Sequence, residues 1–163
     1  MKWSEIILQS LLVWFFQLVF SDFLAINTIK PDFCVILILY WSIIHGRAFG
    51  IISGFFFGLL IDFSGSGLLL GLSPLVYSIT GYLIGSLSEH YSRFNSFYFF
   101  IFWLAILLLH FFIFCSVVYQ DLWDIDRGLF WGKTFGTSIY TLSFMGIFQF
   151  ILPLDKFIDA KSR

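Results

Sequence analysis

Long apolar stretches joined by short polar connections are the dominant pattern along this chain. Six windows contain no Asp, Glu, Lys or Arg, and they cover residues 6–21, 33–46, 48–61, 63–88, 94–120 and 134–154. A helix needs about 20 predominantly apolar residues to cross the roughly 30 Å hydrocarbon core of a bilayer. The last three windows reach that length, and the first does so once residues at the membrane interface are included. The pattern therefore predicts membrane-spanning helices.

The second and third windows are shorter than the others. Apolar segments of about 10–14 residues are more often buried in protein or re-entrant than independently spanning. We interpret these two as short helices packed on each other, with a turn at His45, Gly46 and Arg47. The predicted fold is an all-α six-helix bundle that forms one transmembrane domain over residues 1–163. Its helices are expected at about 3–21, 31–45, 47–62, 68–88, 96–119 and 129–152.

Composition and charge agree with a membrane protein and indicate its orientation. Hydrophobic residues make up 60% of the chain and charged residues 12%, whereas soluble domains carry about 25% charged residues. With the N-terminus inside, six of the Lys and Arg residues lie in cytoplasmic segments and three in outer segments. The positive-inside rule then favours cytoplasmic termini. The net charge of −1 argues against nucleic acid as a partner.

Glycine returns at every fourth position in the third predicted helix, at Gly46, Gly50, Gly54 and Gly58. Each interior glycine costs roughly 1 kcal/mol relative to alanine, so a compensating gain is expected. Spacing of four drifts by only about 40° around a helix and leaves a groove without side chains. Lipid gives helices no hydrophobic reason to associate, so close contact at such a groove becomes a main source of association.

Two further helices carry small residues at helical spacing. Gly81 and Gly85 share a face with Ser78 and Ser88, and Gly132 and Gly136 follow Gly128. Three interpretations stay open for these glycines. They can pack the bundle, accept a helix of another protein, or line a cavity for a small molecule.

Two aspartates lie at helix ends on the predicted outer side. Asp32 follows Pro31 at the start of the second helix, where an acid is favoured by the positive end of the helix dipole. Asp62 ends the third helix, where the dipole has the opposite sign and a partner is required. Our hypothesis pairs Asp62 with Lys30, the nearest cation on that side. The alternative is an aspartate turn leading into the sequence FSGSG.

The other polar residues inside the windows give no enzyme signature. His110 is either part of a proton relay or a neutral, hydrogen-bonded structural residue, and the absence of a carboxylate close in sequence favours the second. Cys34 and Cys115 are expected to be buried thiols. Asp32 and Asp62 are the only paired acids, and paired acids alone define no reaction. We therefore expect a protein that is not an enzyme and needs no cofactor or metal.

Residues 30–85 carry a series of features in a definite order. Lys30 and Pro31 open the second helix, Leu39, Tyr40 and Trp41 follow, and Gly54 and Gly58 lead to Asp62. The series ends with Ser64, Gly65 and Ser66 before Leu70 and Gly71. This pattern resembles the MreD family of bacterial rod shape-determining proteins.

The resemblance implies a function that composition and residue spacing alone do not indicate. It implies a multi-pass subunit of the cell-elongation complex in the bacterial inner (plasma) membrane, working in peptidoglycan synthesis with MreC, a single-span protein. Indirect partners would be the actin-like MreB, the glycosyltransferase RodA and a class B penicillin-binding transpeptidase. The family also looks like the substrate-binding subunits of energy-coupling-factor transporters in its six-helix arrangement. The alternative function is therefore that of a transporter subunit that binds a vitamin-like molecule.

Overall fold

The computed structural model describes residues 3–26, 29–64, 69–90 and 96–151. Seven helices and no strand are found in these ranges, with one isolated bridge between Ile26 and Ile29. The helices are α1 (Trp3–Phe23), α2 (Phe33–His45), α3 (Arg47–Phe63), α4 (Leu72–Glu89), α5 (Ser96–Val118), α6 (Gln120–Ile125) and α7 (Arg127–Ile151).

The predicted segments correspond to α1–α5 and α7, with two differences. Helix α4 begins at Leu72 instead of near residue 68, because Gly71 precedes it in the left-handed region at φ 96°. Residue 68 itself lies outside the described residues. The short helix α6 occupies a connection that we expected to be a loop. Trp123 of α6 packs edge-on against Phe130 of α7, with 5.0 Å between the ring centroids.

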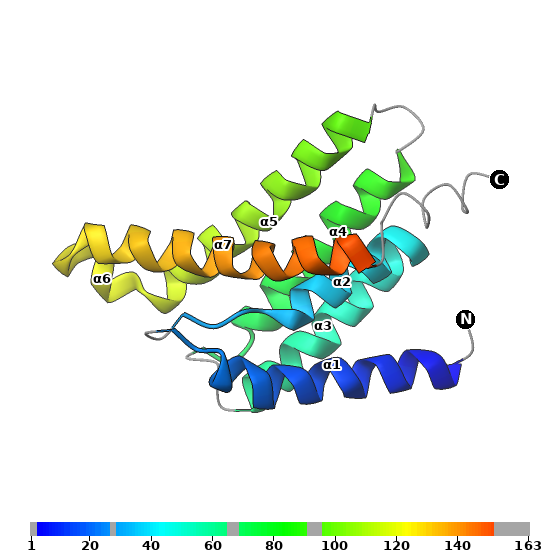
Figure 1. Cartoon of the computed structure of the whole chain (residues 1–163), viewed down its shortest axis with the longest axis horizontal. Coiled ribbons are helices and arrows are strands. Elements are labelled where there is room, and N and C mark those ends of the chain that lie inside the picture. The colour runs from blue at the N-terminus through cyan, green and yellow to red at the C-terminus, as the bar shows by residue number, and fades with distance from the viewer. Residues whose placement is uncertain (1–2, 27–28, 65–68, 91–95, 152–163) are drawn as a thin grey trace.

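Helix α2 forms the centre of the molecule. Ten of its 13 residues are buried, and Figure 1 shows it between α1 and α7. Trp41 joins it to two neighbours, since its ring meets Phe57 of α3 at 5.9 Å and its Nε1 donates to Gln9 of α1 at 3.2 Å. The helix ends at His45, and the φ of 87° at the following Gly46 allows the chain to turn directly into α3. A 13-residue helix is only about 20 Å long, so α2 is shorter than a typical bilayer core.

Helices α3 and α4 are packed backbone against backbone. A Cβ atom on Gly50 or on Gly81 would lie closer than 3.0 Å to the carbonyl group of the other glycine. Gly54 and Gly58 face the backbone of Tyr77 and Pro74 in the same way, and Gly85 faces Arg47. The groove of α3 is therefore filled by α4, which supplies the close contact that offsets the cost of the glycines. Gly46 has a different role, because it forms the turn.

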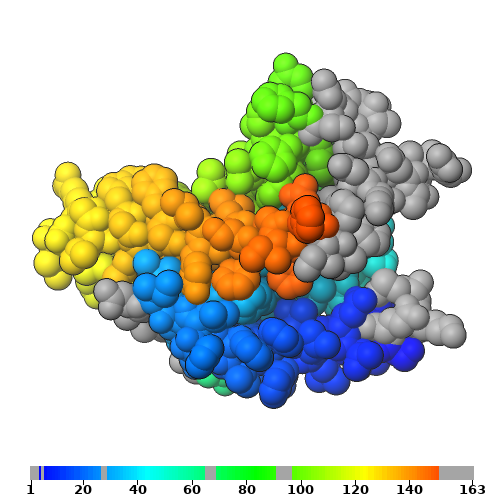
Figure 2. All heavy atoms as spheres, in the orientation of Figure 1, coloured from blue at the N-terminus to red at the C-terminus, as the bar shows by residue number. Residues whose placement is uncertain are grey.

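Helices α1, α5 and α7 lie outside this central group and expose apolar side chains. Within the described residues, two segments are long and apolar enough to cross a membrane by length and composition, Ile6–Phe23 in α1 and Phe97–Val118 in α5. In Figure 1 the start of α1 and the end of α7 lie at the same end of the molecule. Helix α6 and the start of α7 project at the opposite end of the molecule, as the space-filling view in Figure 2 also shows.

Candidate functional site

The first turn of α2 lies inside the helix bundle, so its backbone N–H groups need partners from the protein. The Asp32 carboxylate caps the helix by accepting from the Val35 N–H at 3.0 Å. Gln17 of α1 accepts from the Phe33 N–H at 2.7 Å, and Thr141 of α7 accepts from the Asp32 N–H at 3.1 Å. Three helices therefore join at this point through donors that lipid cannot satisfy.

Asp32 also belongs to a polar chain that runs deeper into the bundle. Its Oδ2 accepts a hydrogen bond from the Tyr77 hydroxyl and lies 3.9 Å from His110 Nε2. The rings of Tyr77 and His110 are stacked, with centroids 5.1 Å apart. His110 Nδ1 lies 2.8 Å from Thr80 Oγ1. Since the Thr80 hydroxyl donates to the Val76 carbonyl, Nδ1–H of His110 is the donor in that bond.

A carboxylate is therefore close to His110 in space although none is close in sequence. The His110 side chain is 1% exposed and that of Asp32 is 15% exposed. A partly buried acid, a tyrosine and a histidine held together in this way can bind a polar group or share a proton. Among the residues described, this series of hydrogen-bonded groups stops at the Thr80 hydroxyl and the Val76 carbonyl. It therefore does not form a proton path across the molecule.

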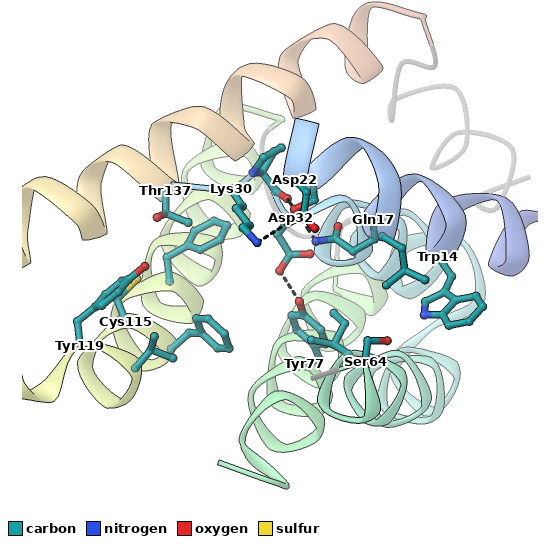
Figure 3. A pocket seen from close by; sticks show the side chains of 17 residues that line it. Trp14, Gln17, Asp22, Lys30, Asp32, Ser64, Tyr77, Cys115, Tyr119 and Thr137 are labelled. Atoms are coloured by element: carbon teal, nitrogen blue, oxygen red, sulfur yellow. Dashed lines mark hydrogen bonds and ion pairs between the residues drawn. The ribbon is translucent and has the colours of Figure 1, made fainter. Parts of the chain in front are cut away.

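A cavity of about 430 Å³ lies next to this polar chain, and we call it the α2 pocket. Figure 3 shows Trp14, Gln17 and Asp32 on one side of it and Cys115, Tyr119 and Thr137 on the other. Apolar walls come from α1, α3 and α5, and the polar lining includes Asp22, Lys30, Asp32 and Tyr77. The pocket occupies space at the end where the short helix α2 begins, so the polar start of α2 forms part of its lining.

Lys30 does not pair with Asp62, and that hypothesis is wrong. Its ammonium group forms an ion pair with Asp22 at the end of α1, across the connection between α1 and α2. The short distance along the chain explains this choice, because residues 22 and 30 are joined by a reversal containing the Ile26–Ile29 bridge.

Asp62 is stabilised by the beginning of the next helix. Its Oδ2 accepts from the Gly71 N–H at 2.6 Å, and the side chain is buried. The carboxylate therefore lies near the positive end of the α4 dipole, which offsets its unfavourable place at the end of α3. The other end of this hairpin is built in a related way. There Glu89, the last residue of α4, accepts from the Arg47 N–H at 3.5 Å and lies 3.6 Å from the Arg47 guanidinium.

The glycines of α7 differ from those of α3. Among the residues that the structure describes, a Cβ atom on Gly132 would meet nothing within 4 Å, and one on Gly128 would meet only the Asp126 carboxylate, at 3.2 Å. Gly136 is covered by the side chain of Ile29. Leu129, Phe135 and Ile139 beside this groove are 55%, 53% and 62% exposed. The groove at Gly128 and Gly132 is therefore open to the surroundings.

Several residues of this site carry no recognisable signal in the sequence. Tyr77, Thr80 and Thr141 look like ordinary positions in apolar helices, and their roles depend on which helices are neighbours. Trp14 is similar. Its side chain lines the α2 pocket, and its Nε1 is buried with no hydrogen-bond partner among the residues described. The predicted thiols Cys34 and Cys115 are both free and buried. No group of three or more His, Cys, Asp or Glu side chains suited to a metal ion is present among the described residues.

These features define a helical membrane protein with a short, buried central helix and a polar pocket at the start of that helix. The family model for the rod shape-determining protein MreD matches residues 1–157. The chain therefore belongs to the MreD family, a family of membrane proteins with a role in rod shape determination. Searches of curated proteins and of solved structures found no match. The expected likeness to energy-coupling-factor subunits accordingly stays a prediction.

Proposed function

We propose that this protein is a non-catalytic scaffold of the rod-shape complex in the bacterial inner membrane, and that it binds the membrane span of MreC. In this proposal the chain crosses the membrane six times with both termini in the cytoplasm. MreB, RodA and a class B penicillin-binding transpeptidase are reached indirectly, in support of peptidoglycan synthesis. Family membership supports this role over that of a vitamin transporter subunit.

The observation that carries the proposal is the difference between the two glycine grooves. The groove of α3 is filled by α4, so it offers no surface to another protein. The groove at Gly128 and Gly132 of α7 is open and flanked by exposed apolar side chains. A single membrane span can approach a helix backbone closely at such a position. We infer that the MreC span packs on this face of α7.

Site-specific photo-crosslinking in cells tests this placement. A photoreactive residue replaces Phe135 or Ile139, which flank the open groove. Matched controls replace Phe56 of α3 and Leu108 of α5, which are also exposed, at 59% and 41%. Crosslinks to MreC from the α7 positions alone are expected. Crosslinks from Phe56 or Leu108 with none from α7 would move the contact to another face.

Blocking the groove gives an independent test. Gly132→Leu fills the groove from an exposed position, and we expect MreC to be lost from the purified complex. Ala105→Leu is the matched control, because Ala105 is a small exposed residue of α5. Full MreC recovery with Gly132→Leu would contradict binding at this groove.

A further inference from the structure

The α2 pocket contains groups of both charges beside an apolar wall. Asp22 and Asp32 supply carboxylates, and Lys30 supplies an ammonium group. Leu18, Ile61 and Val118 contribute aliphatic surface to the same cavity. A volume of about 430 Å³ lies within the range of roughly 300–1,000 Å³ found for small-molecule sites. A molecule that suits this lining carries a positive group, a negative group and an apolar part.

The positions of the charges favour a zwitterionic head. The Asp32 carboxylate is 15% exposed and accepts from the Tyr77 hydroxyl, and both residues line the pocket. A cation that enters the pocket therefore meets an acid and a phenol oxygen together. Lys30 keeps 49% of its side chain exposed although it pairs with Asp22. It can therefore turn its ammonium group to an anion such as a phosphate.

An unpartnered donor supports the same ligand class. Trp14 Nε1 is buried and has no hydrogen-bond partner within the described part of the chain, although a buried indole N–H normally finds one. The indole lines the α2 pocket on the side shared with Gln17. A phosphate or ester oxygen in the pocket would give this N–H its missing acceptor.

We propose that the α2 pocket binds the head group of a zwitterionic phospholipid with a primary ammonium and a phosphate, such as phosphatidylethanolamine. The ammonium group lies against Asp32 and Tyr77. The phosphate accepts from Lys30 and Trp14, and the acyl chains leave along the apolar side chains of the cavity. This site does not depend on MreC, so its failure and the failure of the scaffold proposal are separate results.

Native mass spectrometry of the full-length protein, purified without MreC, tests the proposal. The protein is exchanged into micelles with phosphatidylethanolamine or phosphatidylglycerol at equal concentration. We expect retention of one phosphatidylethanolamine at least tenfold above phosphatidylglycerol. A third arm with soluble phosphoethanolamine distinguishes a lipid from a free zwitterion. Preferential retention of the soluble compound would overturn the lipid assignment, and equal retention of both lipids would overturn the site.

Conservative variants connect the retention to the pocket. Asp32→Asn keeps one oxygen that can cap the Val35 N–H and places an amide N–H where the Tyr77 oxygen can accept it, but it removes the charge. Trp14→Phe removes the indole N–H. Each should lower phosphatidylethanolamine retention about tenfold while the elution profile of the folded protein is unchanged. Asp124→Asn and Trp123→Phe are matched controls in α6, and they should retain the lipid. Equal retention in all four variants would contradict binding in the α2 pocket.

Discussion

The glycines of α3 and those of α7 have similar spacing but different surroundings. Those of α3 meet the small face of α4, where Gly81 and Gly85 allow the two backbones to touch. Helix α7 packs partly on α5, whose sequence FYFFIFWLAILLLHFFIF is mostly large side chains and offers no small face like that of α4. Glycine spacing therefore marks a groove, whereas the neighbouring helix decides whether the groove is filled inside the protein or left for a partner.

The largest expected effect tests this comparison directly. Gly54→Ala would place a Cβ closer than 3.0 Å to the Tyr77 backbone, which cannot move without shifting α4. We expect a loss of about 3 kcal/mol in the free energy of unfolding, at the upper end for an overpacked core. Gly132→Ala, with open space around it, should be neutral or stabilise by up to about 1 kcal/mol. Unfolding titrations in detergent measure both, and equal effects would remove the distinction between the grooves.

The two ends of the α3–α4 hairpin should differ in strength. Asp62→Ala removes a buried carboxylate and its charge-assisted hydrogen bond from the Gly71 N–H, so we expect a loss of about 2 kcal/mol. Asp62→Asn retains an acceptor and should recover part of that loss. Glu89→Ala removes a more exposed pair with Arg47 and should cost less than about 1 kcal/mol. A larger loss at Glu89 than at Asp62 in the same titration would reverse this order.

The hydrogen bond between the Asp32 N–H and Thr141 connects the start of α2 to α7, and its contribution to stability can be measured in the same way. Thr141→Val removes the acceptor of the Asp32 N–H with little change in shape, and we expect a cost of about 1 kcal/mol. Thr137→Val is the control one helical turn earlier, because Thr137 lines the pocket and forms no hydrogen bond to the described residues of α2. Identical stability of the two variants would show that α7 does not hold this end of α2.

The smallest effect concerns the ion pair at the surface. A double-mutant cycle on Lys30 and Asp22 should give a coupling of about 0.5 kcal/mol, since both side chains are largely exposed. The same cycle on Lys30 and Asp62 should give none. If Lys30 were coupled to Asp62 and not to Asp22, the ion pair predicted from the sequence would be correct and the Lys30–Asp22 pair would be wrong.

Much of the fold can be predicted from the apolar windows, whereas the site cannot. The turn at Gly46 and the helix start at Asp32 follow from local chemistry, which the sequence shows directly. The partner of Asp62 is nine residues away but depends on how the next helix begins. Tyr77, His110 and Thr141 come together only through the packing of α2, α4, α5 and α7, and a single sequence carries no record of that packing. Residue spacing therefore predicts helix ends better than it predicts partners.

The short central helix has a consequence for how the protein is made. As α2 leaves the ribosome it spans only about 20 Å, too little to cross a bilayer core of roughly 30 Å alone. Its N-terminal donors also depend on Gln17, already synthesised, and on Thr141, which is synthesised 109 residues after Asp32. Helix α2 is therefore best inserted together with α3 as a hairpin. The N-terminal end of α2 then stays hydrated until α7 is inserted. Completion of α7 is therefore the step that closes the bundle.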